Sequence, residues 1–189
     1  MSRGTNGKNN DRLYRYDLTI AYDVSTCAFV KDVDPDTDAL AGTSFGGRPD
    51  KSRHHVHGIE INPDGTKIFL VFNDVNGTGD GVKEYNLSTP YDIDTMSLVT
   101  SGGIHLSKGA AGFNPDAIFI GLNGKRLFVT DHDKYTVTQF TLHNPYDTSS
   151  FTEDGSVSIQ DLTSDNNNQT RALGFSKNGL KMFVSDDTG

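Results

Sequence analysis

The chain has 189 residues and a formal net charge of −8, and 34% of its residues are hydrophobic and 10% aromatic. This composition suits one folded domain, while an acidic balance without a Lys/Arg cluster argues against a nucleic-acid or anionic-membrane partner. The single cysteine excludes an intrachain disulfide, and no apolar run resembles a membrane helix or a secretory signal, so the compartment stays open.

The chain begins with two predicted strands, over residues 13–18 and 27–33, joined by a turn at 21–24. Abundant Gly, Asn, Asp, Ser and Thr with few Glu residues favour short strands and turns over helices. The segment 34–54 comes next and lacks a counterpart later in the chain. We expect it to form an inserted loop.

Three segments then align without a gap around a turn glycine. They cover residues 58–71, 117–130 and 172–185, and their glycines Gly65, Gly124 and Gly179 lie 59 and 55 residues apart. Each segment contains two short apolar strands joined by an Asx-Gly turn that can take positive φ, a pattern typical of a β-hairpin.

A second element recurs in step with these hairpins. Residues 82–87 with 89–93, and 137–142 with 144–148, repeat the strand and turn of the N-terminal end. Weaker β-branched or apolar stretches follow each turn, at 27–33, 96–100 and 156–162, and we interpret them as fourth, outer strands. Four strands in a period of about 55 residues predict a β-propeller blade.

The hairpin 62–71 resembles the repeat of YVTN-type and related bacterial propellers, and 85–93 resembles repeats of bacterial and phage surface proteins. The resemblance covers nearly the whole chain and implies an all-β propeller. The chain has no Trp, so the WD dipeptide of WD40 blades is absent. Propellers of this kind include scaffolds, adhesins, lactonases and lyases, so the resemblance implies an architecture and no single function.

The strand order predicts about three blades in one propeller domain, with the two chain ends sharing a blade. Residues 55–101 and 116–162 form complete blades, 1–33 supply the two outer strands of the shared blade, and 171–186 supply its two inner strands. Three blades cannot close a ring, and unpaired strand edges need a cover. We expect a homodimer that exchanges these half-blades to close a six-bladed ring; the alternative is a fragment of a longer propeller.

Candidate ligand-binding residues lie where the inner strands begin. His55 and His57 share one face of an extended strand and are suited to a transition metal. The other inner strands contribute Asp116 and Arg171 at equivalent positions. These four residues predict a site for a small polar or anionic ligand at the mouth of the central channel. The alternative is that they are solvated residues at strand starts.

Calcium is the one cofactor that the sequence suggests, and the ligand itself stays unknown. Oxygen-bearing side chains alternate at Asp74, Asn76, Thr78 and Asp80, as they do in calcium loops. No bidentate Glu follows at the usual offset, and a plain Asn/Gly hairpin explains the pattern equally well.

No motif connects a nucleophile with a base, and Cys27 has no motif linking it to a histidine. We therefore expect a non-enzymatic binding or structural module, at a cell or virion surface, that uses the channel mouth and the inserted loop. The alternative is a lactonase-like hydrolase or lyase with a channel metal held by His55 and His57. The remaining histidines, His105, His132 and His143, are predicted to lie on the surface.

Overall fold

The computed structural model describes residues 12–33, 35, 54–74, 80–106, 113–159 and 168–188. Its strands are β1 (Leu13–Leu18), β2 (Cys27–Val33), β3 (His54–Ile61), β4 (Lys67–Asp74), β5 (Gly81–Leu87), β6 (Met96–Leu98), β7 (Ile104–His105), β8 (Pro115–Gly121), β9 (Arg126–Asp131), β10 (Thr136–Asn144), β11 (Asp147–Ser158), β12 (Asn168–Phe175) and β13 (Met182–Thr188). Two 3₁₀ turns, η1 (Val24–Thr26) and η2 (Ile93–Thr95), precede β2 and β6. Across these ranges no helix is long and apolar enough to span a membrane.

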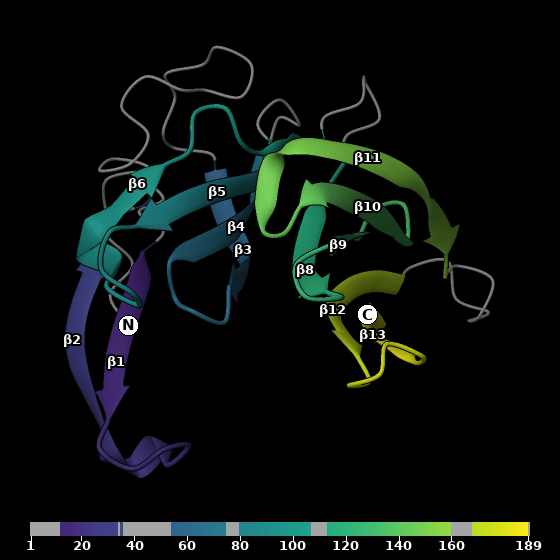
Figure 1. Ribbon diagram of the computed structural model, residues 1–189. Helices are drawn as coiled ribbons and strands as arrows, with labels where there is room; N and C mark the ends of the chain where they lie inside the picture. The colour runs from purple at the N-terminus through teal and green to yellow at the C-terminus, as the bar shows by residue number, and fades with distance from the viewer. Residues whose placement is uncertain are drawn as a thin grey trace.

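The strands pair into antiparallel sheets that follow one another along an arc (Figure 1). The sheets β3-β4-β5-β6 and β8-β9-β10-β11 each have the four-stranded order of a blade, and the short β7 also pairs with β5. The two-stranded hairpins β1-β2 and β12-β13 lie at opposite ends of the arc. The predicted all-β class and four-stranded blades are therefore confirmed.

The outer strand of the second complete blade was placed wrongly by the sequence pattern. The expected strand at 156–162 is instead β11, which begins at Asp147, directly after the turn, and pairs with β10 along most of its length. Most of β11 is exposed to solvent. An exposed edge strand needs no apolar alternation, so the pattern that marks buried strands was missing there.

Among the described residues, two hydrophobic cores fill the spaces between neighbouring sheets. One includes Phe69 and Val71 of β4 with Leu127 and Phe140 of the next sheet, and the other includes Ile68 of β4 and residues of β2 and β5. Alternate residues of β4 thus enter opposite cores. Because both faces of the sheet are buried, β4 reads as a continuous apolar run.

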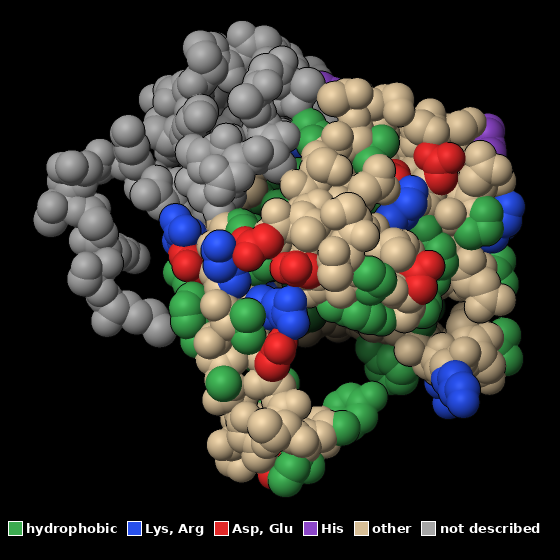
Figure 2. Space-filling model, turned by 60° about the vertical axis from the view of Figure 1, so that its left-hand side comes forward, with side chains coloured by type: hydrophobic (Ala, Val, Ile, Leu, Met, Phe, Trp, Pro, Cys, Tyr) green, Lys and Arg blue, Asp and Glu red, His purple; other side chains and the backbone are tan. Residues whose placement is uncertain are grey.

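Charged side chains also join the hairpin β1-β2 to the neighbouring sheet. Lys31 Nζ lies 3.0 Å from Asp94 Oδ1, and Arg15 Nη1 lies 3.6 Å from Asp92 Oδ1. Figure 2 shows Lys/Arg and Asp/Glu side chains next to one another on this face. Exposed ion pairs of this kind add little stability, so the hairpin depends mainly on the apolar core.

Each complete blade is tied together by a tyrosine that lies on a turn glycine. Gly65 and Gly124 have φ of 72° and 85°, and a Cβ on either would lie 2.4 Å from a ring carbon of Tyr91 or Tyr146, respectively. The backbone N–H of Tyr91 donates to Gly65 O at 2.8 Å, and that of Tyr146 to Gly124 O at 3.0 Å. Glycine is thus required at both positions, because the turn needs a positive φ and the tyrosine ring leaves no room for a Cβ.

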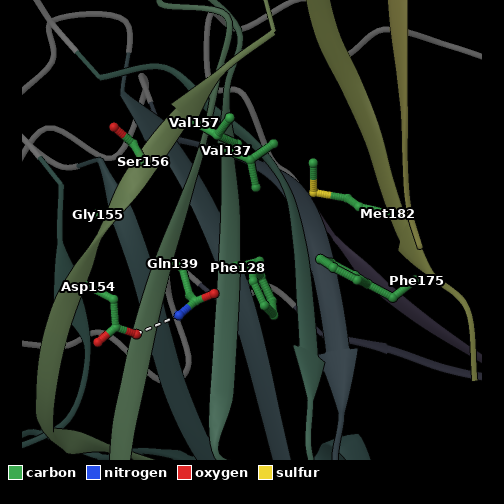
Figure 3. Close-up of a pocket in the computed structure, with 9 residues that line it drawn as sticks. All are labelled: Phe128, Val137, Gln139, Asp154, Gly155, Ser156, Val157, Phe175 and Met182. Carbon is green, nitrogen blue, oxygen red and sulfur yellow. Dashed lines mark hydrogen bonds between the residues drawn. The ribbon is translucent and has the colours of Figure 1, made fainter. Parts of the chain in front are cut away.

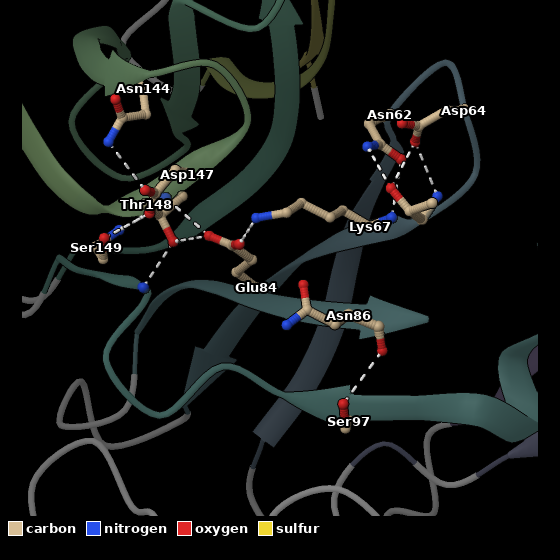
Figure 4. A network of polar contacts seen from close by, with 12 residues as sticks. Asn62, Asp64, Lys67, Glu84, Asn86, Ser97, Asn144, Asp147, Thr148 and Ser149 are labelled. Atoms are coloured by element: carbon tan, nitrogen blue, oxygen red, sulfur yellow. Dashed lines mark hydrogen bonds and ion pairs between the residues drawn. The ribbon is translucent and has the colours of Figure 1, made fainter. Parts of the chain in front are cut away.

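A buried carboxylate links the two complete sheets (Figure 4). Glu84 of β5 is 1% exposed and pairs with the Lys67 ammonium of β4. It accepts hydrogen bonds from the backbone N–H and the hydroxyl of Thr148, in β11 of the next sheet, at 2.7 and 2.8 Å. The Thr148 hydroxyl in turn accepts from Gly103 N at 2.7 Å. These partners offset the desolvation of the charge and fix the position of one sheet against the other.

The substitution Gly124→Ala should lower the free energy of unfolding by about 2–4 kcal/mol, because the added Cβ strains the positive φ and collides with the Tyr146 ring. Gly174→Ala is the matched control, since a Cβ there meets nothing within 4 Å. It should leave stability unchanged or slightly improved. Urea unfolding measures both variants, and equal losses would contradict the role given to the turn glycine.

Candidate functional site

The inner strands β3, β8 and β12 contact one another in succession, and each is irregular at the same repeat position. Their pairing registers shift between Val56 and Gly58, between Pro115 and Ile118, and between Thr170 and Ala172. The residues His57, Asp116 and Arg171 lie within these shifts and immediately precede the aligned repeat segments. A β-bulge redirects the side chain that it carries, so the three bulges present equivalent residues of successive blades to one region.

The three bulge residues meet around the buried carboxylate of Asp116. Asp116 is 4% exposed, and its Oδ1 lies 2.5 Å from His57 Nδ1. Its Oδ2 accepts a hydrogen bond from Arg171 Nη1 at 3.1 Å. A carboxylate only accepts hydrogen bonds, so His57 Nδ1 carries the proton in this contact. The structure thus brings together three of the four residues predicted for the channel mouth.

The fourth predicted residue, His55, lies beside this group on β3. The ring centroids of His55 and His57 are 6.2 Å apart at an interplanar angle of 67°. Among the residues that the structure describes, no group of three or more His, Cys, Asp or Glu side chains could hold a metal ion.

His132 belongs to the same cluster, which corrects its prediction as a surface residue. Its side chain is 16% exposed, and its Nδ1 lies 3.3 Å from Asp116 Oδ2, an ion-pair distance. Its Nε2 lies 2.9 Å from Asp133 Oδ1, and the Asn114 side-chain amide donates to the other Asp133 oxygen. The sequence carried no spacing signal for His132, because the end of β9 is placed beside β8 only by strand pairing. The backbone bond from His132 N to Asn114 O, at 3.0 Å, marks this pairing.

A second buried carboxylate shapes the turn that carries His132. Asp131 is fully buried, and its Oδ1 accepts the backbone N–H groups of Asp133 and Lys134 at 3.1 and 3.2 Å. Burial raises the pKa of Asp131 above its ordinary value, and these backbone bonds only partly oppose the shift. Asp131 therefore holds the turn that places His132 next to Asp116.

The pKa of Asp116 is set by two opposing effects. Burial raises it, whereas the hydrogen bond and charge of His57, the charge of His132 and the hydrogen bond from Arg171 lower it. The balance lowers the pKa of Asp116 below its ordinary value. The ionised carboxylate is thus the form that the cluster stabilises.

The predicted calcium residues are placed only in part. Asp80 is fully buried immediately before β5, and Asp74 ends β4. Asn76 and Thr78 lie outside the described residues, as does most of the inserted segment 34–54. Calcium binding in this hairpin stays a prediction.

A cavity of about 410 Å³ lies apart from the cluster, between the sheet β8–β11 and the hairpin β12-β13 (Figure 3). Its lining is formed by Phe128, Val137, Gln139, Asp154, Gly155, Ser156, Val157, Phe175 and Met182. The Gln139 side-chain amide donates to Asp154 Oδ2 at 2.7 Å along one wall. None of the predicted site residues lines this cavity.

The substitution Asp116→Asn should reduce the acid sensitivity of folding. Because the folded-state pKa of Asp116 is lowered, the unfolded chain binds this proton more tightly, and the ionised group stabilises the fold above about pH 4. That contribution is lost as the pH falls through the folded-state pKa. The stability difference between wild type and variant, measured by urea unfolding, should therefore shrink as the pH falls below about 4. A difference that stays constant with pH would contradict this; exposed Glu153→Gln is the control.

No family model matches the chain, and no curated protein matches it. Solved structures do: a protein from Bacteroides fragilis named as a candidate 6-phosphogluconolactonase matches with a TM-score of 0.59 and 14% identity, over 94% of this chain and 45% of that one. The periplasmic gluconolactonase of Pseudomonas aeruginosa matches with a TM-score of 0.56 and 14% identity, over 93% of this chain and 43% of that one. The β-propeller domain of Cps50 (Swd1) from Myceliophteria thermophila matches with a TM-score of 0.53 and 14% identity, over 94% of this chain and 48% of that one.

The chain spans less than half the length of each of these structures. At such low identity the likeness shows the fold alone. The chain is therefore part of a β-propeller.

Proposed function

We propose that the chain is a non-enzymatic binding module that takes a small anionic ligand at the cluster of His57, Asp116 and Arg171. One observation carries this proposal: three repeat-equivalent residues, each displaced by its own bulge, converge from successive inner strands. If these residues were only solvated side chains where strands begin, they would not need to share a buried carboxylate. Inner strands face the propeller axis, where small ligands are commonly bound.

The exposure of the cluster favours an anion over a cation. The Asp116 side chain is 4% exposed, whereas those of His57 and Arg171 are 30% and 41% exposed. An approaching ligand thus meets the imidazole and the guanidinium, while the carboxylate that positions them is shielded. The guanidinium binds carboxylate or phosphate through charge-assisted hydrogen bonds, and the imidazole does so in its protonated form, in which Nε2 is also a donor.

The test is a calorimetric titration with inorganic phosphate, gluconate, 6-phosphogluconate and citrate. At least one should bind wild type, and Arg171→Gln should weaken that binding about tenfold, as expected for the loss of one charge-assisted contact. Lys177→Gln removes one positive charge from the turn of the same hairpin and is the control. Equal effects of the two variants, or no binding to wild type, would contradict the proposal.

A lactone hydrolase is the second candidate, and the geometry of His57 supports it. With Nδ1 held by Asp116 at 2.5 Å, the imidazole is fixed in the tautomer whose Nε2 can accept a proton from water. The likeness of the fold to gluconolactonases agrees with this chemistry. This candidate differs from the hydrolase expected from the sequence, in which His55 and His57 hold a channel metal. Here His57 itself acts as the base.

Hydrolysis of glucono-δ-lactone and 6-phosphogluconolactone, followed with a pH indicator against the spontaneous rate, separates the two functions. A hydrolase that uses His57 as its base should lose about 10²-fold or more of its rate in His57→Gln. It should keep its rate in exposed His143→Gln. A metal-dependent hydrolase would lose activity in chelator, and a binding module would show only the spontaneous rate.

A further inference from the structure

The hairpins at the two ends of the arc leave the tyrosine-on-glycine contact unmade. Tyr22 occupies the repeat position of Tyr91, with a similar φ of 64°, yet its side chain is 100% exposed. Gly179 occupies the position of Gly65, with φ of 71°, and a Cβ there would meet nothing within 4 Å. Each hairpin thus carries one half of the contact that closes a complete blade.

The edges of these hairpins also expose side chains that complete blades bury. Tyr16 of β1 is 51% exposed, whereas Tyr85 at the same position of β5 is fully buried. Met182 of β13 is 38% exposed, whereas Ile68 of β4 is 1% exposed. Figure 2 shows hydrophobic side chains on the projecting lower end of the molecule. Clustered apolar exposure of this kind indicates an interaction surface.

The two open edges carry one pair of opposite charges in the register of the complete blades, Lys181 and Asp17, and the Asp17 carboxylate accepts hydrogen bonds from Arg15 of the same strand. In the pair β4–β5, Lys67 lies opposite Asn86, and the pair β9–β10 has the same register. The same register between β13 and β1 places Lys181 opposite Asp17. Opposite charges that face one another across an antiparallel pair stabilise it.

The cavity beside β12-β13 has the position that a bound tyrosine would need. Between the complete sheets, the ring of Tyr146 lies 6.5 Å from the ring of Phe69. The repeat equivalent of Phe69 in the next sheet is Phe128, which lines the cavity of about 410 Å³ (Figure 3). A tyrosine placed over Gly179 would therefore enter this cavity.

We propose that the hairpin β1-β2 of a second copy of this chain completes the blade begun by β12-β13. Its strand β1 pairs with β13, and its Tyr22 covers Gly179 and enters the cavity. A second copy is the occupant because its hairpin carries both the matching tyrosine and the charge complementary to Lys181. The reciprocal contact closes two chains into a two-fold ring in which two clusters of His57, Asp116 and Arg171 face a common axis.

Light scattering coupled to size exclusion tests the assembly. The 189-residue chain should have a mass of twice 20.6 kDa, and dilution should shift it toward one chain. A single-chain mass at every concentration would overturn the proposal, because the open edges would then have no affinity for each other.

The substitution Tyr22→Ala tests the contact itself. It should weaken the dimer about tenfold or more, as the loss of a buried aromatic anchor does. The control is Leu122→Ala, which removes another exposed apolar side chain, from the turn of a complete blade. It should dimerise as wild type does. Circular dichroism checks that both variants stay folded, and a Tyr22→Ala chain with wild-type affinity would overturn the assignment.

A charge exchange tests the register. Chains with Lys181→Asp or Asp17→Lys each place like charges opposite one another in both shared blades of a homodimer, and each should associate more weakly than wild type. Mixing the two variants restores an opposite-charge pair in both shared blades of the heterodimer. An affinity-tagged Lys181→Asp chain should therefore retain untagged Asp17→Lys in preference to wild type. Equal retention of the two would overturn the predicted register.

Discussion

The fold depends on a tyrosine ring seated on a turn glycine. This contact joins the turn between the two inner strands of a blade to the turn between its two outer strands, as in Gly65 with Tyr91 and Gly124 with Tyr146. Both members lie within one repeat, so a blade is organised mostly by its own segment. Because each hairpin is held by its own strand pairing, the end hairpins form without the tyrosine–glycine contact, but their apolar edges stay exposed.

Buried carboxylates perform two different tasks on this scaffold. Glu84 is satisfied by Lys67 and Thr148 and fixes one blade against the next. Asp116 accepts hydrogen bonds from side chains of β3 and β12, and His132 of the turn after β9 lies 3.3 Å from it, so the carboxylate gathers these side chains into one group. In both cases the cost of burying a charge is offset by donors from separate elements, so the charge specifies how those elements are arranged.

The bulges redirect single polar side chains of the inner strands while the rest of each strand keeps its pairing. A regular inner strand would alternate its side chains between the two faces of the sheet. An extra residue at His57, Asp116 and Arg171 redirects one side chain per blade while the following hairpin keeps its register. The identity of that residue differs from blade to blade, which combines an imidazole, a carboxylate and a guanidinium in one place.

The sequence by itself determined the all-β class, the hairpins around Gly65, Gly124 and Gly179, and the equivalence of His57, Asp116 and Arg171, because turn chemistry and apolar periodicity are local. It missed β7, misplaced β11, and assigned His132 to the surface. The exposed β11 has no apolar alternation to mark it, and β7 is only two residues long. The bulges and the approach of His132 to Asp116 were decided only by tertiary structure, because they arise from pairing between strands that are distant in the chain.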